Sequence, residues 1–451
     1  MPLPTGTRTR TRTRTRTPSR TRARNGPGTI TGTDAGRTSA APAPASAADP
    51  TAAPAPAAST RAHQVPVGWL ALLATPVAAS ANSPVLILPD MAGALGVRTA
   101  TATWLVTAFA WAMAVGTPLM AALLRRRGLG SVLRLSTALI VAGTAAVALA
   151  PWLPLAMAGR VAQAAGGAGL VTVAMSLAGT VRRMGVITAG FGTLGAVGPL
   201  LGSTLAGALS WRASLAVGVL ALFALPAIGR CADLSAPPRA TPFDGRGATL
   251  LVLLATALVL VPRHPLQAVA AALVATLLLA LHVRTRPTGF VPAALLRTRS
   301  FVLYTLLACA LATSYFTLLF TVPQLLRDRT DWSTSAIGTG QLVALLAGSA
   351  LSMVLAAASA RLGRRGVLTI LLTAGTLAPL TAVTIPWPPV LLLVALLAVF
   401  ATSAGMATLS VYGTQAAPDA QRPTAMGLFN LCYQLGGAFG PAVAALITLG
   451  A

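Results

Sequence analysis

The residue of this sequence that is best placed to do chemistry is an arginine inside a long apolar run. Arg160 lies seven residues into the run 153–177, and Gln163 follows at a spacing that puts both side chains on one face of a helix. An arginine away from water is costly unless it faces a partner. Two interpretations therefore stay open: the pair lines the path of a substrate, or Arg160 is a structural residue bonded to backbone carbonyls.

Further polar and aromatic side chains lie inside other apolar runs and are candidates to line the same path. These candidates are Ser80, Asn82, Trp111, Tyr315, Asn430 and Gln434. Glycines and prolines gather at helical spacing in two of the runs. They are Gly190, Gly198, Pro199 and Gly202 in one run, and Gly437, Gly440 and Pro441 in the other. Small residues let helix backbones approach closely, and prolines kink helices, so a packing role and a gating role both fit.

Carboxylates, by contrast, are absent from the interior of every apolar run. The nearest is Asp90, at the end of the first run, where it would either take part in proton transfer or cap a helix. The three histidines lie at the edges of runs, and the three cysteines show no metal-ligand spacing. There is no Ser-His-Asp arrangement and no phosphate-binding glycine loop. The sequence therefore predicts no enzyme, no cofactor and no metal site.

The segments that carry these residues are long enough to cross a lipid bilayer. Hydrophobic residues make up 55% of the 451 positions and charged residues 9%, against about 25% charged residues in soluble domains. A spanning helix needs about 20 apolar residues. Runs near that length are 66–87, 101–123, 132–150, 153–177, 184–208, 213–230, 248–262, 266–283, 301–323, 336–358, 366–385, 388–412 and 424–449. We predict an all-α, polytopic membrane protein of about thirteen spans, with the bilayer as its first partner.

The arginines between the runs indicate how the chain is oriented. With the N-terminus inside, the inner loops hold most of them, including Arg125, Arg126, Arg127, Arg364 and Arg365, and the outer loops hold few. Membrane proteins carry such an excess of basic residues on the cytoplasmic side. We predict a cell-membrane protein with a cytoplasmic N-terminus and, because the number of spans is odd, an outer C-terminus.

Residues 1–64 differ in composition from the rest of the chain. This tail is rich in Arg, Thr, Ala and Pro and has no hydrophobic periodicity, so the sequence predicts disorder. Its arginines would suit anionic lipid headgroups or RNA, or the tail has no function. Most other arginines lie in short loops between apolar runs, which explains much of the net charge of +25. We expect no nucleic-acid partner.

The sequence also contains an internal repeat. RRRGLGSVL at 125–133 and RLGRRGVL at 361–368 each open an apolar run that closes on Pro-Trp, so that Gly128 corresponds to Gly363. GAVGP at 195–199 and GAFGP at 437–441 form a second pair. Parallel repeats are typical of transporters built from two related halves, with the substrate site between them.

Four stretches make the chain resemble the major facilitator superfamily, and within it the fourteen-span drug:proton antiporter group. They are LPDMAGALG at 88–96, GRVAQAAGGAG at 159–169, GAVGPLLGS at 195–203 with Ser-Trp-Arg at 210–212, and FDGRG at 243–247 with LLRTRSF at 295–301. The resemblance implies a two-half bundle, with halves at 65–231 and 300–451 and two inserted spans at 245–284. It also implies a secondary active transporter that exports small apolar or drug-like compounds by alternating access, coupled to protons.

Departures from the group's pattern leave other functions open. Arg125 stands in the loop after the second span where the superfamily carries an aspartate, and Ala360 stands at the equivalent place in the second half. Ser80 replaces the aspartate of the group's first span, and the last of fourteen spans is not seen. Uptake of an anionic metabolite, which Arg160 would suit, and a transport-inactive member of the family remain alternatives. We expect a small-molecule substrate and a monomer.

Overall fold

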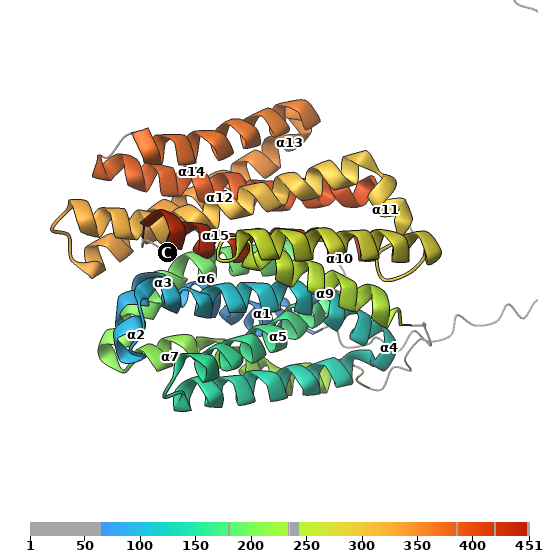
Figure 1. Ribbon diagram of the computed structural model, residues 1–451, viewed down its shortest axis with the longest axis horizontal. Helices are drawn as coiled ribbons and strands as arrows, with labels where there is room; N and C mark the ends of the chain where they lie inside the picture. The colour runs from blue at the N-terminus through green and yellow to red at the C-terminus, as the bar shows by residue number, and fades with distance from the viewer. Residues whose placement is uncertain are drawn as a thin grey trace, which may run out of the picture. The chain divides into compact units, whose positions relative to one another are not determined.

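The computed structural model describes residues 65–178, 181–232, 234, 243–384, 387–418 and 421–448. All of them belong to one compact unit, Thr60–Ala451. The tail predicted at 1–64 lies outside the described residues. Within those residues the regular structure is helical and contains no strand, as Figure 1 shows.

We group the helices by their order in the chain, following the division into two halves and an inserted hairpin that the sequence predicts. The N-terminal half holds α1 (Val67–Asn82), η1 (Ser83–Leu86), α2 (Leu88–Ala94), α3 (Thr99–Ala102), α4 (Trp104–Leu149), α5 (Leu153–Ala178), α6 (Val181–Ala208), α7 (Trp211–Leu215), η2 (Val217–Ala224) and α8 (Leu225–Cys231). The inserted hairpin holds α9 (Gly245–Leu260) and α10 (Pro265–Thr285). The C-terminal half holds α11 (Ala293–Arg297), α12 (Arg299–Arg329), α13 (Thr334–Thr384), α14 (Pro388–Gln415) and α15 (Arg422–Thr448).

Each of the thirteen apolar runs corresponds to helix in this structure. In the described part of the chain, nine helices are long and apolar enough to cross a bilayer, and one of them, Thr99–Leu149, holds two of the predicted runs. Two shorter apolar helices, Val217–Cys231 and Gly245–Leu260, cover two more runs, and α15 covers the last. The prediction of an all-α membrane bundle of about thirteen spans is confirmed.

Two glycines divide the longest helices at corresponding places of the repeat. Gly128 in α4 has a φ of 77°, and Gly363 in α13 has a φ of 66°. Side chains with a Cβ rarely adopt this left-handed conformation, whereas glycine adopts it freely. The equivalence of Gly128 and Gly363 inferred from the sequence is thus a structural equivalence, because both residues turn one span into the next.

Two predicted spans are less regular than their hydrophobicity suggested. The first run, 66–87, leaves the α-helix at Asn82 and continues as the 3-10 helix η1, which has Pro84 in its first turn. The sixth run, 213–230, consists of α7, η2 and α8, and Pro226 lies in the first turn of α8. Proline removes a backbone donor and so favours such breaks. Hydropathy measures how apolar a segment is, so it does not detect these breaks in the helix.

The same helix pairs pack together in both halves. In the N-terminal half α1 packs on α6 and α4 packs on α5, and in the C-terminal half α12 packs on α15 and α13 packs on α14. GAVGP lies in α6 and GAFGP in α15, so the second repeat also occupies equivalent helices. Between the halves, α4 packs on α15 and α6 on α13.

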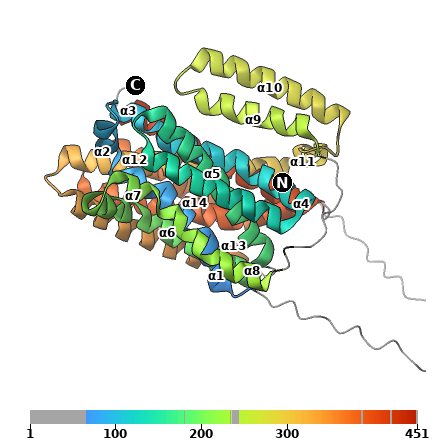
Figure 2. The same cartoon turned by 90° about the horizontal axis from the view of Figure 1, so that it is seen from below.

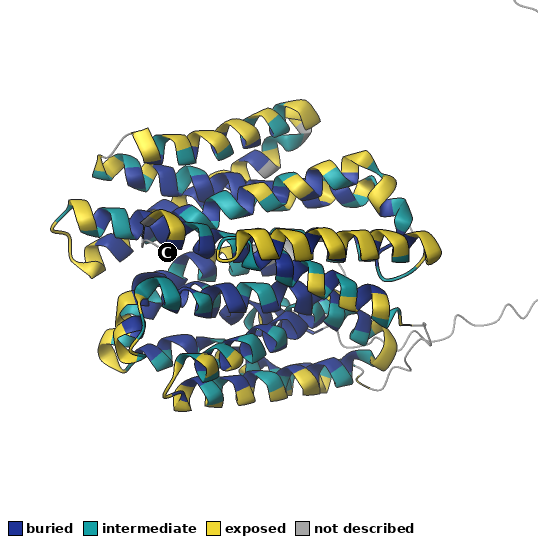
Figure 3. Cartoon of the chain, viewed as in Figure 1, coloured by how far each residue is buried: buried dark blue, intermediate teal, exposed yellow. Residues whose placement is uncertain are grey.

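The inserted hairpin lies at the edge of this packing. Figure 2 shows α9 and α10 side by side, with α9 on the side of the bundle, where it contacts α4 and α15. Large apolar side chains of α10 are exposed, among them Leu266, Leu273 and Leu277, whose exposed fractions are 86%, 66% and 61%. Figure 3 shows the same outward exposure along the helix. Such a surface suits lipid.

The two ends of the spans differ in residue type. We use "tryptophan end" for the end with Trp104, Trp152 and Trp211, and "arginine end" for the end with Arg126 and Arg364. Consistent with this division, the Arg263 guanidinium lies 5.9 Å from the Trp104 ring, and Arg212 donates a hydrogen bond to the Ala150 carbonyl at 2.8 Å. Both contacts join residues of the tryptophan end.

Apolar packing joins the halves mainly toward the tryptophan end. One buried cluster there combines N-terminal residues such as Leu86 and Ala196 with Leu319 and Ile337 of the C-terminal half. A second cluster, which includes Leu129 and Ile187, consists of N-terminal residues alone. In the cluster that contains the core of the C-terminal half and the hairpin, the N-terminal half supplies only two of the buried residues, Ala114 and Val115.

Candidate functional site

The Arg160 side chain is completely buried within the N-terminal half. Its Nη1 donates to the Ser80 hydroxyl at 3.2 Å and to Gln163 Oε1 at 3.0 Å, and its Nη2 donates to the Ser80 carbonyl at 3.0 Å. The guanidinium carbon also lies 4.1 Å from the centre of the Phe109 ring. A ring face attracts a cation, most strongly where water is excluded.

Gln163 extends these contacts to two more segments. Its Nε2 donates to the Thr144 hydroxyl at 3.0 Å and to the Leu215 carbonyl at 3.2 Å, and the Ser80 hydroxyl reaches the same carbonyl at 3.2 Å. We call Ser80, Phe109, Thr144, Arg160 and Gln163 the Arg160 network. It ties α1, α4, α5 and α7 together without a carboxylate among its members.

A small cavity adjoins the Arg160 network. Its volume is about 10 Å³, which is room for about one water molecule, and Ser80, Phe109, Thr144 and Gln163 are among its lining residues. Such a site can hold a water by several hydrogen bonds, but it is far too small for a drug-sized compound. The bond to the Ser80 carbonyl is the contact that the structural interpretation of Arg160 predicts. That the network lines a substrate path stays a prediction.

The other candidate path residues do not gather around Arg160. Asn82 donates to the Gly195 carbonyl of α6 at 2.9 Å, and Trp111 donates to the Thr256 hydroxyl of α9 at 3.1 Å. Tyr315 is buried in α12, where its ring centre lies 4.8 Å from that of Phe316. Asn430 and Gln434 are half-buried in α15. The structure therefore distributes these residues over both halves, and their role in a path stays a prediction.

Close backbone approach explains the glycines of α6. A Cβ at Gly190 would lie 2.9 Å from Thr75 Cγ2, one at Gly198 would lie 3.0 Å from the Ala79 carbonyl oxygen, and one at Gly202 would overlap the Ser83 carbonyl. All three contacts are with α1 or η1. Pro199 is buried inside the same helix.

The equivalent glycines of α15 meet α12 in the same way. A Cβ at Gly437 would lie 3.2 Å from the Phe316 ring, and one at Gly440 would overlap the Phe316 Cβ. Thr317 donates to the Gly440 carbonyl at 3.3 Å, and Pro441 is buried in the helix. The packing interpretation of both glycine groups agrees with these contacts, whereas a gating role stays a prediction.

Asp90 lies apart from the Arg160 network, in the first turn of α2 at the tryptophan end, and is exposed. Close by, Arg327 of the C-terminal half donates a hydrogen bond to the Leu86 carbonyl at 2.5 Å. This bond joins the two halves next to Asp90. A proton-linked role for Asp90 stays a prediction.

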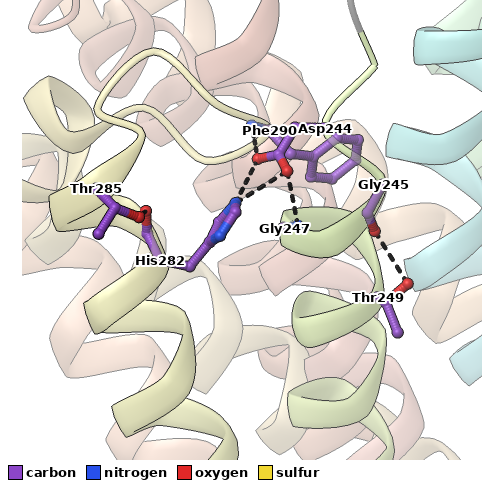
Figure 4. Close-up of polar contacts among 7 residues, drawn as sticks. All are labelled: Asp244, Gly245, Gly247, Thr249, His282, Thr285 and Phe290. Atoms are coloured by element: carbon purple, nitrogen blue, oxygen red, sulfur yellow. Dashed lines mark hydrogen bonds and ion pairs between the residues drawn. The ribbon is translucent and has the colours of Figure 1, made fainter.

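A second polar cluster surrounds Asp244 (Figure 4), which was named from the sequence only as part of the FDGRG stretch and not as a site residue. The Asp244 carboxylate accepts hydrogen bonds from the backbone N–H groups of Gly247 and Phe290, each at 2.9 Å, and both of its oxygens lie 2.9 Å from His282 Nε2. The Asp244 and His282 side chains are only 11% and 14% exposed. The available signal was an aspartate just before an apolar run, which is typical of a helix N-cap.

The environment of Asp244 favours its ionised form. Burial acts to raise the pKa of this carboxyl, but the backbone hydrogen bonds from Phe290 and Gly247 and the contact with His282 together outweigh it. The pKa of Asp244 is therefore lower than its ordinary value. In the described residues, no group of three or more His, Cys, Asp or Glu could hold a metal ion.

Comparison with known proteins shows to which family this helical architecture belongs. The sequence profile of the Major Facilitator Superfamily matches residues 68–441. A "Chloramphenicol resistance protein" of Streptomyces lividans is 35% identical over 202 residues, which cover 41% of this chain and 50% of that protein. The chain thus matches about half the length of this relative.

Solved structures of transporters share the fold. A POT family transporter in complex with a thioalcohol-conjugated peptide aligns with a TM-score of 0.60 at 15% identity, over 85% of this chain and 91% of that one. A D-xylose-proton symporter aligns with a TM-score of 0.57 at 14% identity, over 85% and 90%. At this level of identity the likeness concerns the fold alone.

Proposed function

Because the chain belongs to the major facilitator superfamily, we propose that it exports small, largely apolar compounds as a secondary transporter. In this mechanism the two halves rock about a site between them and open it to each side of the membrane in turn. The observation that carries the proposal is the character of the residues where the halves meet, which are apolar and aromatic.

The packing between the halves supports an uncharged substrate. Tyr315, Phe316 and Leu319 of the C-terminal half pack with Leu86 and other apolar residues of the N-terminal half. Aromatic rings with an occasional hydroxyl or amide suit a ligand that is mostly apolar and has a few polar atoms. The buried cation, Arg160, already has partners in its own half, which weakens the case for an anionic metabolite.

The direction of transport is inferred from the relative. Its name, "Chloramphenicol resistance protein", describes resistance to a toxic compound, and a membrane transporter can confer resistance by removing such a compound from the cell. We extend that direction to this chain. The arginine end is proposed to face the cytoplasm of a cell-membrane protein, because basic residues accumulate on that side.

Proton coupling would have to work without a carboxylate inside the described spans. Arginine acts as a fixed cation rather than a proton carrier. We propose that a coupled proton would travel through Asp90, through the substrate, or through water held at the Arg160 network. The small cavity beside Ser80 and Gln163 supports the last of these routes.

Transport by the purified protein in proteoliposomes tests the proposal. With the arginine end outside and an acidic lumen, we expect accumulation of radiolabelled chloramphenicol, chosen as a neutral aromatic probe, and none of benzoate, chosen as a small anionic one. Empty liposomes measure passive entry of both probes. Protein-dependent loss of preloaded benzoate from the acidic lumen would favour the anion importer, and no flux of a wider panel of apolar compounds would favour the inactive alternative.

A further inference from the structure

We propose that Phe243, Asp244, His282 and Phe290 form a latch that holds the arginine end of the bundle together and opens when substrate passes that end. The latch rests on the proposed function in one respect, because it assumes that the halves move relative to each other. In this proposal the inserted hairpin, rather than either half, supplies the contacts that hold the arginine end together.

The first step is that one carboxylate joins three segments. Asp244 caps α9 through the Gly247 N–H, contacts His282 near the end of α10, and accepts a hydrogen bond from the Phe290 N–H in the loop that leads into the C-terminal half. Figure 4 shows these contacts converging on the two carboxylate oxygens. Charge-assisted hydrogen bonds of this kind are about twice as strong as neutral ones.

The second step is that the surrounding backbone leaves room for this carboxylate. A Cβ at Gly247 or at Gly289 would overlap Asp244 Oδ2. Gly247 lies in the first turn of α9, and Gly289 lies in the loop after α10. The two glycines therefore let both segments close around Asp244, which makes the cluster a built site rather than a chance surface contact.

The third step connects the latch to the N-terminal half. The Phe243 ring meets the Phe290 ring edge to face, with centres 6.1 Å apart and planes at 84°. On its other side, the guanidinium carbon of Arg126 lies 5.4 Å from the centre of the Phe243 ring. Arg126 belongs to α4, just before the turn at Gly128.

The connection to the C-terminal half runs through Phe290. This ring packs against the apolar cluster that contains Phe301 and Leu428 of the C-terminal half. It also lines a small hollow together with Pro118 of α4 and Leu431 of α15. Arg126, Phe243 and Phe290 thus form a continuous contact from one half to the other across the hairpin.

Among the residues that the structure describes, the carboxylate at the arginine end comes from the start of the hairpin. Position 125, where the resemblance to the superfamily predicts an aspartate, is an arginine. Of the acidic residues that the structure describes, Asp244 is the only one at the arginine end, since Asp90, Asp328 and Asp331 lie near the other end. Basic residues near it are Arg125, Arg126 and Arg127 on α4, and Arg246, Arg284 and Arg286 on the hairpin and the residue after it.

The test measures the distance between the halves in the full-length protein, reconstituted in liposomes without substrate. Spin labels on Arg134→Cys and Arg365→Cys, which are exposed at the arginine end on opposite halves, report the separation in a background without the native cysteines. Asp244→Asn keeps the shape of the side chain but removes its charge. We expect the ratio of long to short distances to rise about tenfold, as expected for losing hydrogen bonds to a charged group.

Two further variants make the result decisive. Phe243→Leu keeps apolar bulk but removes the ring between Arg126 and Phe290, and we expect the same change in direction. Thr249→Val is the matched control, because among the described residues the Thr249 hydroxyl bonds to the Gly245 carbonyl of its own helix, and it should leave the distances unchanged. Unchanged distances in both Asp244→Asn and Phe243→Leu would overturn the latch. Since no substrate is needed, missing transport would count against the proposed function alone.

Discussion

The Arg160 network and the latch are two polar clusters that differ in what they connect. Arg160 is wholly buried, and its contacts run between helices of one half. Asp244 lies at helix ends, retains slight exposure, and joins the hairpin to the loop that enters the other half. Breaking buried bonds leaves polar groups without partners, whereas groups at a helix end can turn to water. The first cluster therefore suits a rigid body and the second suits a junction that opens.

The largest effect on stability is expected from Arg160. Arg160→Gln leaves the Ser80 carbonyl without its charged donor, and Arg160→Lys keeps the charge but loses the planar fork that reaches Ser80 and Gln163 together. We expect each variant to lower the free energy of unfolding by about 1.5–3 kcal/mol, with transport lost as well. Denaturant titration in detergent measures this change. Full stability and full transport in both variants would remove the distinction between the two clusters.

A smaller loss is expected where helix backbones touch within the same half. A Cβ at Gly202 would overlap the Ser83 carbonyl, which cannot move without shifting η1, whereas a Cβ at Gly207 meets nothing within 4 Å. Gly202→Ala should cost about 1–3 kcal/mol. Gly207→Ala, on the same helix, should be neutral or stabilise by up to about 1 kcal/mol. Equal melting temperatures for the two variants would mean that α1 and α6 are less rigidly joined than their contacts indicate.

The sequence predicted most of the fold because lipid imposes a simple rule on composition. Thirteen apolar runs became helices, and the repeat correctly paired Gly128 with Gly363 and the glycines of α6 with those of α15. Hydropathy missed the breaks at Pro84 and in the sixth run, since a 3-10 helix is as apolar as an α-helix. Such local geometry depends on packing that composition does not encode.

The candidate site was less predictable, because side-chain partners depend on helix rotation. The spacing of Arg160 and Gln163 correctly indicated contact between them. It gave no sign that Trp111 faces Thr256 of the hairpin. The contact between Asp244 and His282 was not predicted, because these residues lie 38 positions apart and only the closed hairpin brings them together.

The smallest expected effect is on the pH dependence of stability. This effect distinguishes the two clusters, because the latch contains a carboxylate and the Arg160 network does not. The pKa of Asp244 is lower in the folded protein than its ordinary value of about 3.9. Its ionised form therefore stabilises the fold above about pH 4, and this contribution is lost as the pH falls through the folded pKa. The difference in unfolding free energy between the wild type and Asp244→Asn should shrink as the pH falls below about pH 4, where the carboxyl group becomes protonated. Arg160→Gln should show no such change, because no carboxylate contacts Arg160 in its network. Unfolding at a series of pH values measures both differences. If the Asp244→Asn difference persisted undiminished at about pH 3, the carboxylate charge would not be what holds the latch.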